Sequence, residues 1–129
     1  MSQLQRKILF PTPLYYKDIP NAKDLNKYLF KHIKKWRKDC PEGEAKTNSG
    51  FGWHSPTDMN NKKEYKPLID ELFKMAYECS KDYGIDGKIG LGNMWANINP
   101  TYSYNKTHTH PNSLWSGVYY VKVPKNSGA

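Results

Sequence analysis

The chain has 129 residues, a length that fits one domain and allows a hydrophobic core if the chain is complete. Its aromatic content of 14% and hydrophobic content of 37% argue against a globally disordered protein. The formal net charge of +8 leaves nucleic acid or another anionic surface open as a partner, although the basic residues are spread along the chain.

The cysteines and the N-terminus bear on the compartment. Cys40 and Cys79 have no Cys-x-x-Cys partner, so they predict no disulfide framework and indicate a reducing environment. The first residues lack the apolar core of a signal peptide. No run approaches the ~20 apolar residues of a spanning helix. We therefore expect a cytoplasmic protein with no membrane partner.

The first third of the chain predicts an extended segment followed by a helix. Ile8 to Tyr16 contains two prolines, which exclude a helix and a central strand, so we predict an extended edge segment. Asn21 is a candidate N-cap for the helix. His32 lies on the apolar face of this helix and is expected to pack there rather than bind a ligand. That face repeats at helical spacing and comprises Leu25, Tyr28, Leu29, His32, Ile33 and Trp36.

The middle of the chain predicts a loop and a second helix. Residues 39–61 are rich in Pro, Gly, Ser and Asn, and Phe51 to Ser55 is expected to anchor this loop, the alternative being that it lines a cleft. A second helix is predicted near Glu64 to Tyr83, with Gly84 as its stop. Its expected buried face comprises Tyr65, Leu68, Ile69, Leu72, Met75, Ala76 and Cys79.

The last third of the chain has the period of strands. Residues 94–99 alternate between two kinds of side chain, and Pro100 ends the run. A second strand is predicted at Leu114 to Val123. Helices followed by strands favour an α+β fold with an antiparallel sheet. Residues 126–129 are typical of a turn into a further strand, so we expect a fragment of a longer protein.

A pair of histidines, His108 and His110, lies between the two predicted strands. In an extended segment, residues i and i+2 point to the same face, so both imidazoles can bind one metal ion. Imidazole suits Fe, Zn, Cu and Ni, and the pair therefore does not choose the metal. A catalytic metal site also needs a third protein ligand. The alternative for such a pair in a polar loop is that it binds no metal.

Five segments together resemble a known family, in matching order. They are Phe10–Pro13, Asn48–Ser55, Trp95–Pro100, His108–Ser113 and Trp115–Val121. Along almost its whole length the chain is similar to the 2-oxoglutarate/Fe(II)-dependent oxygenase family of bacteria and phages. The resemblance implies one domain over residues 1–129, with N-terminal helices at about 20–84. These would pack on an antiparallel double-stranded β-helix (jelly-roll, cupin-like) core that begins at about 89–129 and is truncated.

The resemblance also implies a chemistry. It implies a dioxygenase that uses Fe(II) as metal and 2-oxoglutarate as cosubstrate, and that hydroxylates an unknown small-molecule or macromolecular substrate. His108 and His110 match the metal ligands, although His110 stands where the superfamily has a carboxylate. A distal histidine and a basic residue for 2-oxoglutarate are expected beyond Ala129. Candidates for the cosubstrate pocket are Asn97, Tyr119 and Tyr120, with packing in the sheet as the alternative.

Two other functions remain open. One is a non-catalytic, cupin-like protein that binds a metal or a small ligand, but Pro111 to Gly117 lacks the glutamate that the cupin signature expects. The other is a basic nucleic-acid-binding module. It ranks last, because Lys31 to Lys38 lies on a helix whose aromatic residues Tyr28 and Trp36 are predicted to be buried.

Overall fold

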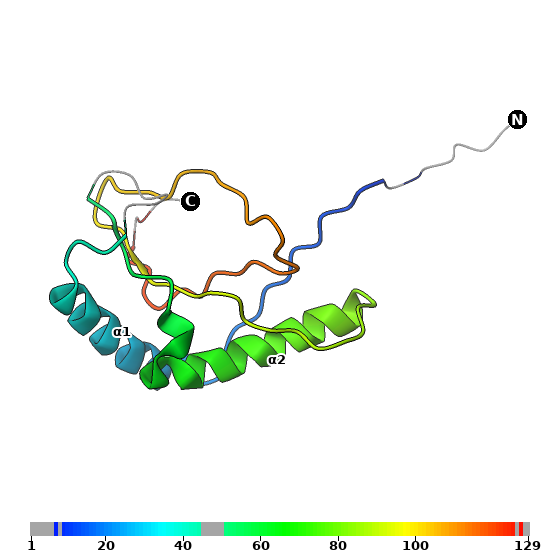
Figure 1. The fold of residues 1–129 in the computed structure, drawn as a ribbon, viewed down its shortest axis with the longest axis horizontal. Helices are drawn as coiled ribbons and strands as arrows, with labels where there is room; N and C mark the ends of the chain where they lie inside the picture. Colours follow the sequence, from blue (N-terminus) through cyan, green and yellow to red (C-terminus); the bar gives the residue numbers. More distant parts are fainter. Residues whose placement is uncertain (1–6, 8, 45–50, 126, 128–129) are drawn as a thin grey trace, which may run out of the picture.

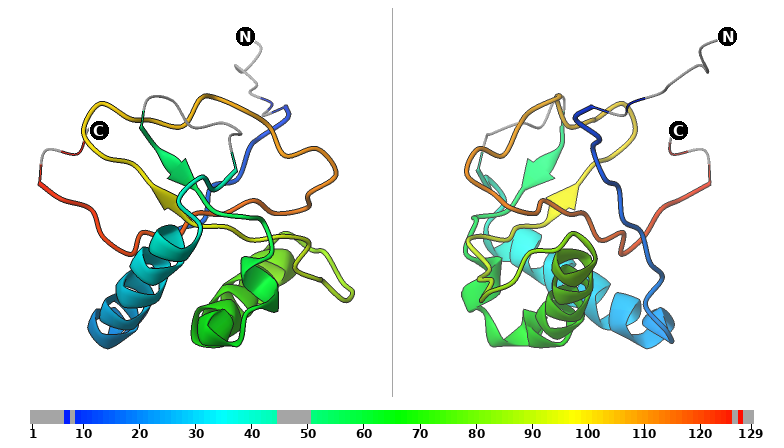
Figure 2. Two further views of the ribbon diagram at one scale, coloured as in Figure 1. Left: turned by 60° about the vertical axis from the view of Figure 1, so that its left-hand side comes forward. Right: turned by 90° about the vertical axis from the view of Figure 1, so that its right-hand side faces the viewer.

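The computed structural model describes residues 7, 9–44, 51–125 and 127. Two helices form one layer, and a small sheet with irregular segments lies over them (Figures 1 and 2). The elements are α1 (Ala22–Asp39), β1 (Trp53–His54), the 3-10 turns η1 (Met59–Asn61) and η2 (Lys63–Tyr65), α2 (Lys66–Asp82) and β2 (Asn97–Ile98). Neither helix has both the length and the apolar character needed to cross a membrane. The fold thus combines helices with an antiparallel sheet, as the element order predicted.

Helix α1 begins where the sequence predicted. Asn21 is its N-cap residue, in the left-handed region at φ 54°, but its side chain makes no capping hydrogen bond. Leu29 and Ile33 are buried and face the core. The predicted burial of Tyr28 is wrong, because its side chain is 40% exposed. The Tyr28 ring lies over the ring of His32, with centroids 4.3 Å apart, and so covers the edge of the apolar face instead of entering it.

Helix α2 follows η2 and also matches its prediction. Pro67 lies in its first turn, where the missing N–H has no helical partner to lose. Gly84 follows the helix at a positive φ of 74°. Cys79 is a free, buried thiol, as predicted, and burial raises its pKa. The core that the helices share with the sheet comprises Leu29, Ile33, Trp53, Met59, Tyr65, Leu68, Ile69 and Ala96.

The sheet gives each strand two different faces. β1 and β2 are antiparallel, with Trp53 opposite Ile98 and His54 opposite Asn97. Directly opposite residues share a face, so Trp53 and Ile98 face the helices while His54 and Asn97 face the other side. The predicted loop over residues 39–61 is therefore wrong at its centre, where a strand forms. The cause is tertiary, since β1 finds in β2 a partner that lies far away in the sequence.

The turn after α1 is hydrogen-bonded to β1. Glu44 donates its backbone N–H to the carbonyl of His54 at 2.7 Å, and the indole of Trp53 donates to the carbonyl of Cys40 at 2.9 Å. Gly43 lies between them at φ 54°, and a Cβ there would meet the His54 carbonyl oxygen at 2.2 Å. Only glycine allows this close approach.

The predicted strand at 114–123 is wrong. The segment has no strand pairing, although its side chains alternate as a strand's do. Tyr119 and Val121 pack against the core, whereas Val118 and Tyr120 are 76% and 71% exposed. A strand needs the N–H and C=O groups of a neighbour, and no segment in the described ranges supplies them. The prediction at 94–99 holds in part, as β2 plus a single bridge between Met94 and Asp58.

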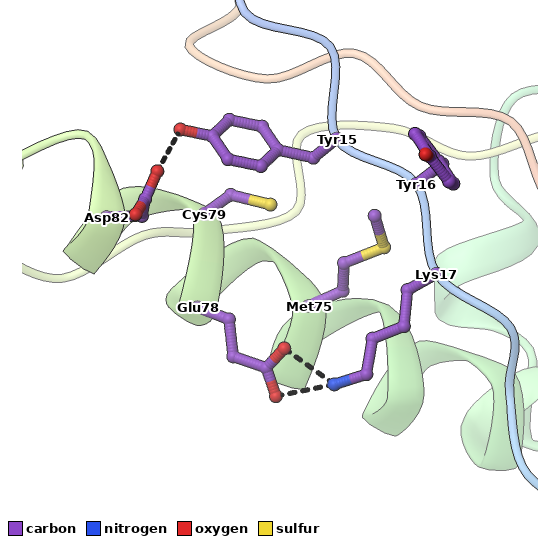
Figure 3. A pocket seen from close by; sticks show the side chains of 7 residues that line it. All are labelled: Tyr15, Tyr16, Lys17, Met75, Glu78, Cys79 and Asp82. Carbon is purple, nitrogen blue, oxygen red and sulfur yellow. Dashed lines mark hydrogen bonds and ion pairs between the residues drawn. The ribbon is translucent and has the colours of Figure 1, made fainter.

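The N-terminal segment forms no helix over residues 9–16, as predicted, but it bends at Phe10 (φ 55°) and pairs with no strand; Ile8 lies outside the described residues. Figure 3 shows that it crosses the C-terminal half of α2. Tyr15 donates to Asp82 Oδ2 at 2.7 Å, and Lys17 pairs with Glu78 at 2.6 Å. Three of the quoted family-like residues, 48–50, and the predicted turn residues 126 and 128–129 also fall outside the described part.

Candidate metal centre

The two histidines of the motif converge. Nε2 of His108 lies 3.1 Å from Nε2 of His110, and the ring centroids are 4.7 Å apart. His108 is exposed and His110 is half-buried. The chain turns directly after them, with Asn112 at φ 65° and the Ser113 N–H donating to the His110 carbonyl at 3.3 Å. The expectation that both rings point to the same side therefore agrees with the structure.

A backbone contact defines the tautomer of His108. Its Nδ1 lies 2.7 Å from the carbonyl oxygen of Lys106. A carbonyl only accepts, so Nδ1 donates to it, and Nε2 of the neutral His108 ring then accepts a hydrogen bond from Nε2 of His110. Histidines that bind metals usually donate their other N–H in this way, because the bond orients the ring and fixes the tautomer. This bond fixes the orientation of the His108 ring.

The distance between the two nitrogens fits a shared ion. Metal–imidazole bonds of about 2.1 Å at a right angle put the two nitrogens about 3.0 Å apart. The observed 3.1 Å is a hydrogen bond between the rings in this structure, and it is also close to the spacing of two adjacent ligands of one ion. Within the described ranges, however, no group of three His, Cys, Asp or Glu side chains gathers that would complete a site. The part of the chain that the structure describes therefore offers two candidate ligands.

Trp95 connects the histidine pair to the sheet. Its ring contacts His110, with centroids 5.6 Å apart, and stacks on His54 at 5.3 Å. His54 is 3% exposed, and its Nδ1 lies 2.6 Å from the Ser55 carbonyl. We did not predict this role of Trp95 from the sequence. The available signal was its alternation with Ala96, which put Trp95 on the face away from the core.

The three cosubstrate candidates lie in different surroundings. Asn97 is exposed on the same sheet face as Trp95. The Tyr119 hydroxyl donates to Asn26 Oδ1 on α1 at 2.6 Å, and burial raises the pKa of this phenol. Tyr120, the next residue of the extended segment, is 71% exposed. The described residues do not gather these side chains into one pocket beside the histidines.

Trp115 fixes the chain after the histidine pair. Its indole N–H donates to Ser80 Oγ on α2 at 2.8 Å. Its ring makes edge contacts with Tyr15 and Tyr83, at centroid distances of 5.6 and 5.9 Å. We call residues 106–113, which carry His108 and His110, the histidine loop. Trp95, just before β2, contacts this loop on one side, and Trp115 anchors the chain after the loop to the end of α2.

Comparison with known proteins supports the resemblance over one part of the chain. The model of a family described as "Putative 2OG-Fe(II) oxygenase" matches residues 93–129, which contain His108 and His110. The helices and β1 lie outside this match. No curated protein matches the chain, and no solved structure does.

Proposed function

We propose that the chain is part or all of a dioxygenase that depends on Fe(II) and 2-oxoglutarate and hydroxylates an unidentified substrate. The observation that carries the proposal is the 3.1 Å between Nε2 of His108 and Nε2 of His110. It lies inside the segment that is similar to the oxygenase family. The third ligand would come from outside the residues that the structure describes.

The residues have separate roles in this proposal. Fe(II), when bound, supplies the chemistry by which O2 and 2-oxoglutarate give succinate, CO2 and a hydroxylated C–H bond. His108, held by the Lys106 carbonyl, and His110, held against Trp95, present two nitrogens in place. Asn97 remains a candidate for binding the cosubstrate carboxylate through its amide.

The proposed fold is a jelly roll in which residues 114–123, which are unpaired in this structure, would become a strand only on pairing with a further strand. Two observations support it. The side chains of this segment already alternate between core and solvent. Its backbone groups also have no ladder partner within the described part of the chain, so a further strand could pair with them.

The experiment is an anaerobic Fe(II) titration, with and without 2-oxoglutarate, read by visible absorption. The proposal predicts a weak charge-transfer band that needs both components. His108→Ala should raise the Kd for Fe(II) by at least about tenfold, because it removes a direct ligand. His32→Gln is the matched control, since His32 lies on α1 against Tyr28, and its Kd should match that of the unchanged chain.

Two outcomes would count against this proposal. Equal Fe(II) affinity of the His108→Ala variant and the unchanged chain would remove the site assignment. Metal binding at the pair without any 2-oxoglutarate-dependent band would favour the alternative of a non-catalytic, cupin-like metal-binding protein. This alternative is favoured by one observation: no third candidate ligand lies beside the histidine pair among the residues that the structure describes.

A further inference from the structure

The two helices of the lower layer carry opposite charge balances. α1 contains seven Lys and Arg residues against two Asp, whereas α2 contains three Lys against four Asp and Glu. On α2, Lys66 pairs with Asp70 and Lys74 pairs with Glu71. Most of the excess positive charge of the chain is therefore on α1, and the lysines of α2 are largely compensated.

The charge on α1 is arranged as a stripe. Five exposed lysines follow one another three or four positions apart, which places them along one side of the helix. This lysine stripe comprises Lys23, Lys27, Lys31, Lys34 and Lys38. None of them has a carboxylate partner within the described ranges, where the ion pair on α1 is between Lys35 and Asp39. Like charges at this spacing repel, so the stripe lacks the compensation that an anionic partner would supply.

An exposed aromatic ring lies within the stripe. Phe30 is 40% exposed, and the ammonium groups of Lys34 and Lys122 lie 5.5 and 5.0 Å from its ring centroid. Lys122 belongs to residues 114–123. The hydrogen bond from Tyr119 to Asn26 fixes this segment to α1. Tertiary structure thus adds a sixth lysine to the charged surface, next to the ring.

We propose that the lysine stripe, with Phe30 and Lys122, binds single-stranded nucleic acid. Ammonium groups would contact the phosphates, and the exposed ring would stack on an unpaired base, which a duplex does not offer. The sequence ranked this partner last because Tyr28 and Trp36 were expected to be buried. The aromatic residue that meets the lysines is a different one, Phe30.

Charge and apolar faces distinguish this partner from a membrane. A helix that inserts into a lipid surface needs a free apolar face beside its basic residues. The apolar face of α1 instead packs in the core through Leu29 and Ile33. The histidine loop lies in the other layer of the molecule (Figure 2). Binding at the stripe does not use the histidine pair and can be tested without a metal.

The test is fluorescence anisotropy with a labelled oligothymidylate of about 12 nucleotides, a length in the range of known single-strand sites. EDTA is present, so that the result does not depend on a metal. The variant Lys27→Gln/Lys31→Gln/Lys34→Gln removes three charges from the stripe. The matched control, Lys66→Gln/Lys74→Gln/Lys81→Gln, removes three charges from exposed lysines of α2 and gives the same net charge.

The stripe variant should bind at least about tenfold more weakly at low salt, and its slope of log K against log salt should fall by about 2, as expected for three lost phosphate contacts. The α2 control should stay within about twofold of the unchanged chain. Phe30→Leu should keep the salt slope and lose roughly fivefold or more in affinity, since it leaves every lysine in place but removes the ring that a base would stack on and that Lys34 and Lys122 contact. Circular dichroism checks that each variant is folded.

Three results would overturn the proposal. The first is an equal loss in the stripe variant and the α2 control, because that would indicate an effect of net charge alone. The second is binding of a duplex of the same length that is as tight as binding of the single strand. The third is the absence of oligonucleotide binding at low salt. This result overturns the proposal whether or not the chain binds phosphatidylserine vesicles or an acidic peptide.

Discussion

The helical layer and the segment of residues 99–125 are stabilised in different ways. In the helical layer, Leu29, Tyr65 and Leu68 are at most 2% exposed and form a common core with the sheet. The segment after β2 has no helix and no paired strand of its own. Side-chain bonds hold it, such as those from Trp115 to Ser80 and from Tyr119 to Asn26.

This difference separates the residues that stabilise the fold from those of the proposed metal site. Burial of apolar area is the dominant favourable term in folding. It is concentrated in the helices, the 3-10 turns and β1, with Ala96 beside them. His108 and His110 lie on residues 99–125, which we call the tethered segment. The family match covers this segment and β2 rather than the helices. Functional side chains often lie on irregular segments that a rigid scaffold positions. We therefore expect substitutions in the two regions to have different consequences.

The largest expected effect is on the core. Leu29→Ala removes a fully buried side chain and should lower the free energy of unfolding by about 2–5 kcal/mol. Val118→Ala is the control on the tethered segment, where the side chain is 76% exposed, and should change it by less than about 0.5 kcal/mol. Urea denaturation measures both. Similar losses would show that the segment belongs to the same packed unit as the helices.

A second test uses pH to sharpen the contrast. Burial raises the pKa of Tyr65 to about 12, from about 10 in an unfolded chain. The folded state therefore favours the neutral phenol. The contribution of the neutral phenol to the free energy of unfolding is complete below pH 10. It is lost as the pH rises toward 12, by on the order of 2 kcal/mol. Tyr65→Phe should remove that part of the pH dependence of the unfolding free energy, and an unchanged dependence would contradict the assignment.

The smallest expected effect concerns the tether at Trp115. Trp115→Phe keeps an aromatic ring but removes the N–H that donates to Ser80 Oγ, and should cost about 1 kcal/mol. A double-mutant cycle with Ser80→Ala isolates this bond, and we expect a coupling energy of about 0.5–1.5 kcal/mol. Additive losses in the cycle would mean that the segment is held by other contacts.

The sequence predicted the helices well because their cause is local. Spacing of apolar residues gave α1 and α2 nearly to their ends, and Gly84 marked the stop. It also gave the alternation at 94–99 and the convergence of His108 and His110, since both follow from the period of an extended chain. The family resemblance agrees with the comparison over residues 93–129.

The errors concern pairing between distant segments. Trp53 and His54 were predicted to be loop residues, because nothing near them in the sequence indicates their partner strand, β2. Residues 114–123 read as a strand because alternation indicates which side chains share a face, but not whether a neighbour is present. Tyr28 lies at the edge of an apolar face, where spacing alone does not decide burial.

Sequence alone thus determined which segments are helical, which are extended, and which two imidazoles can meet, because these depend on backbone periods of a few residues. Only the tertiary structure decided that Trp95 contacts His54 and His110, that Trp115 is fixed to Ser80, and that Lys122 joins the lysine stripe at Phe30. Each of these contacts joins residues far apart in the chain, and their distances depend on how the layers pack.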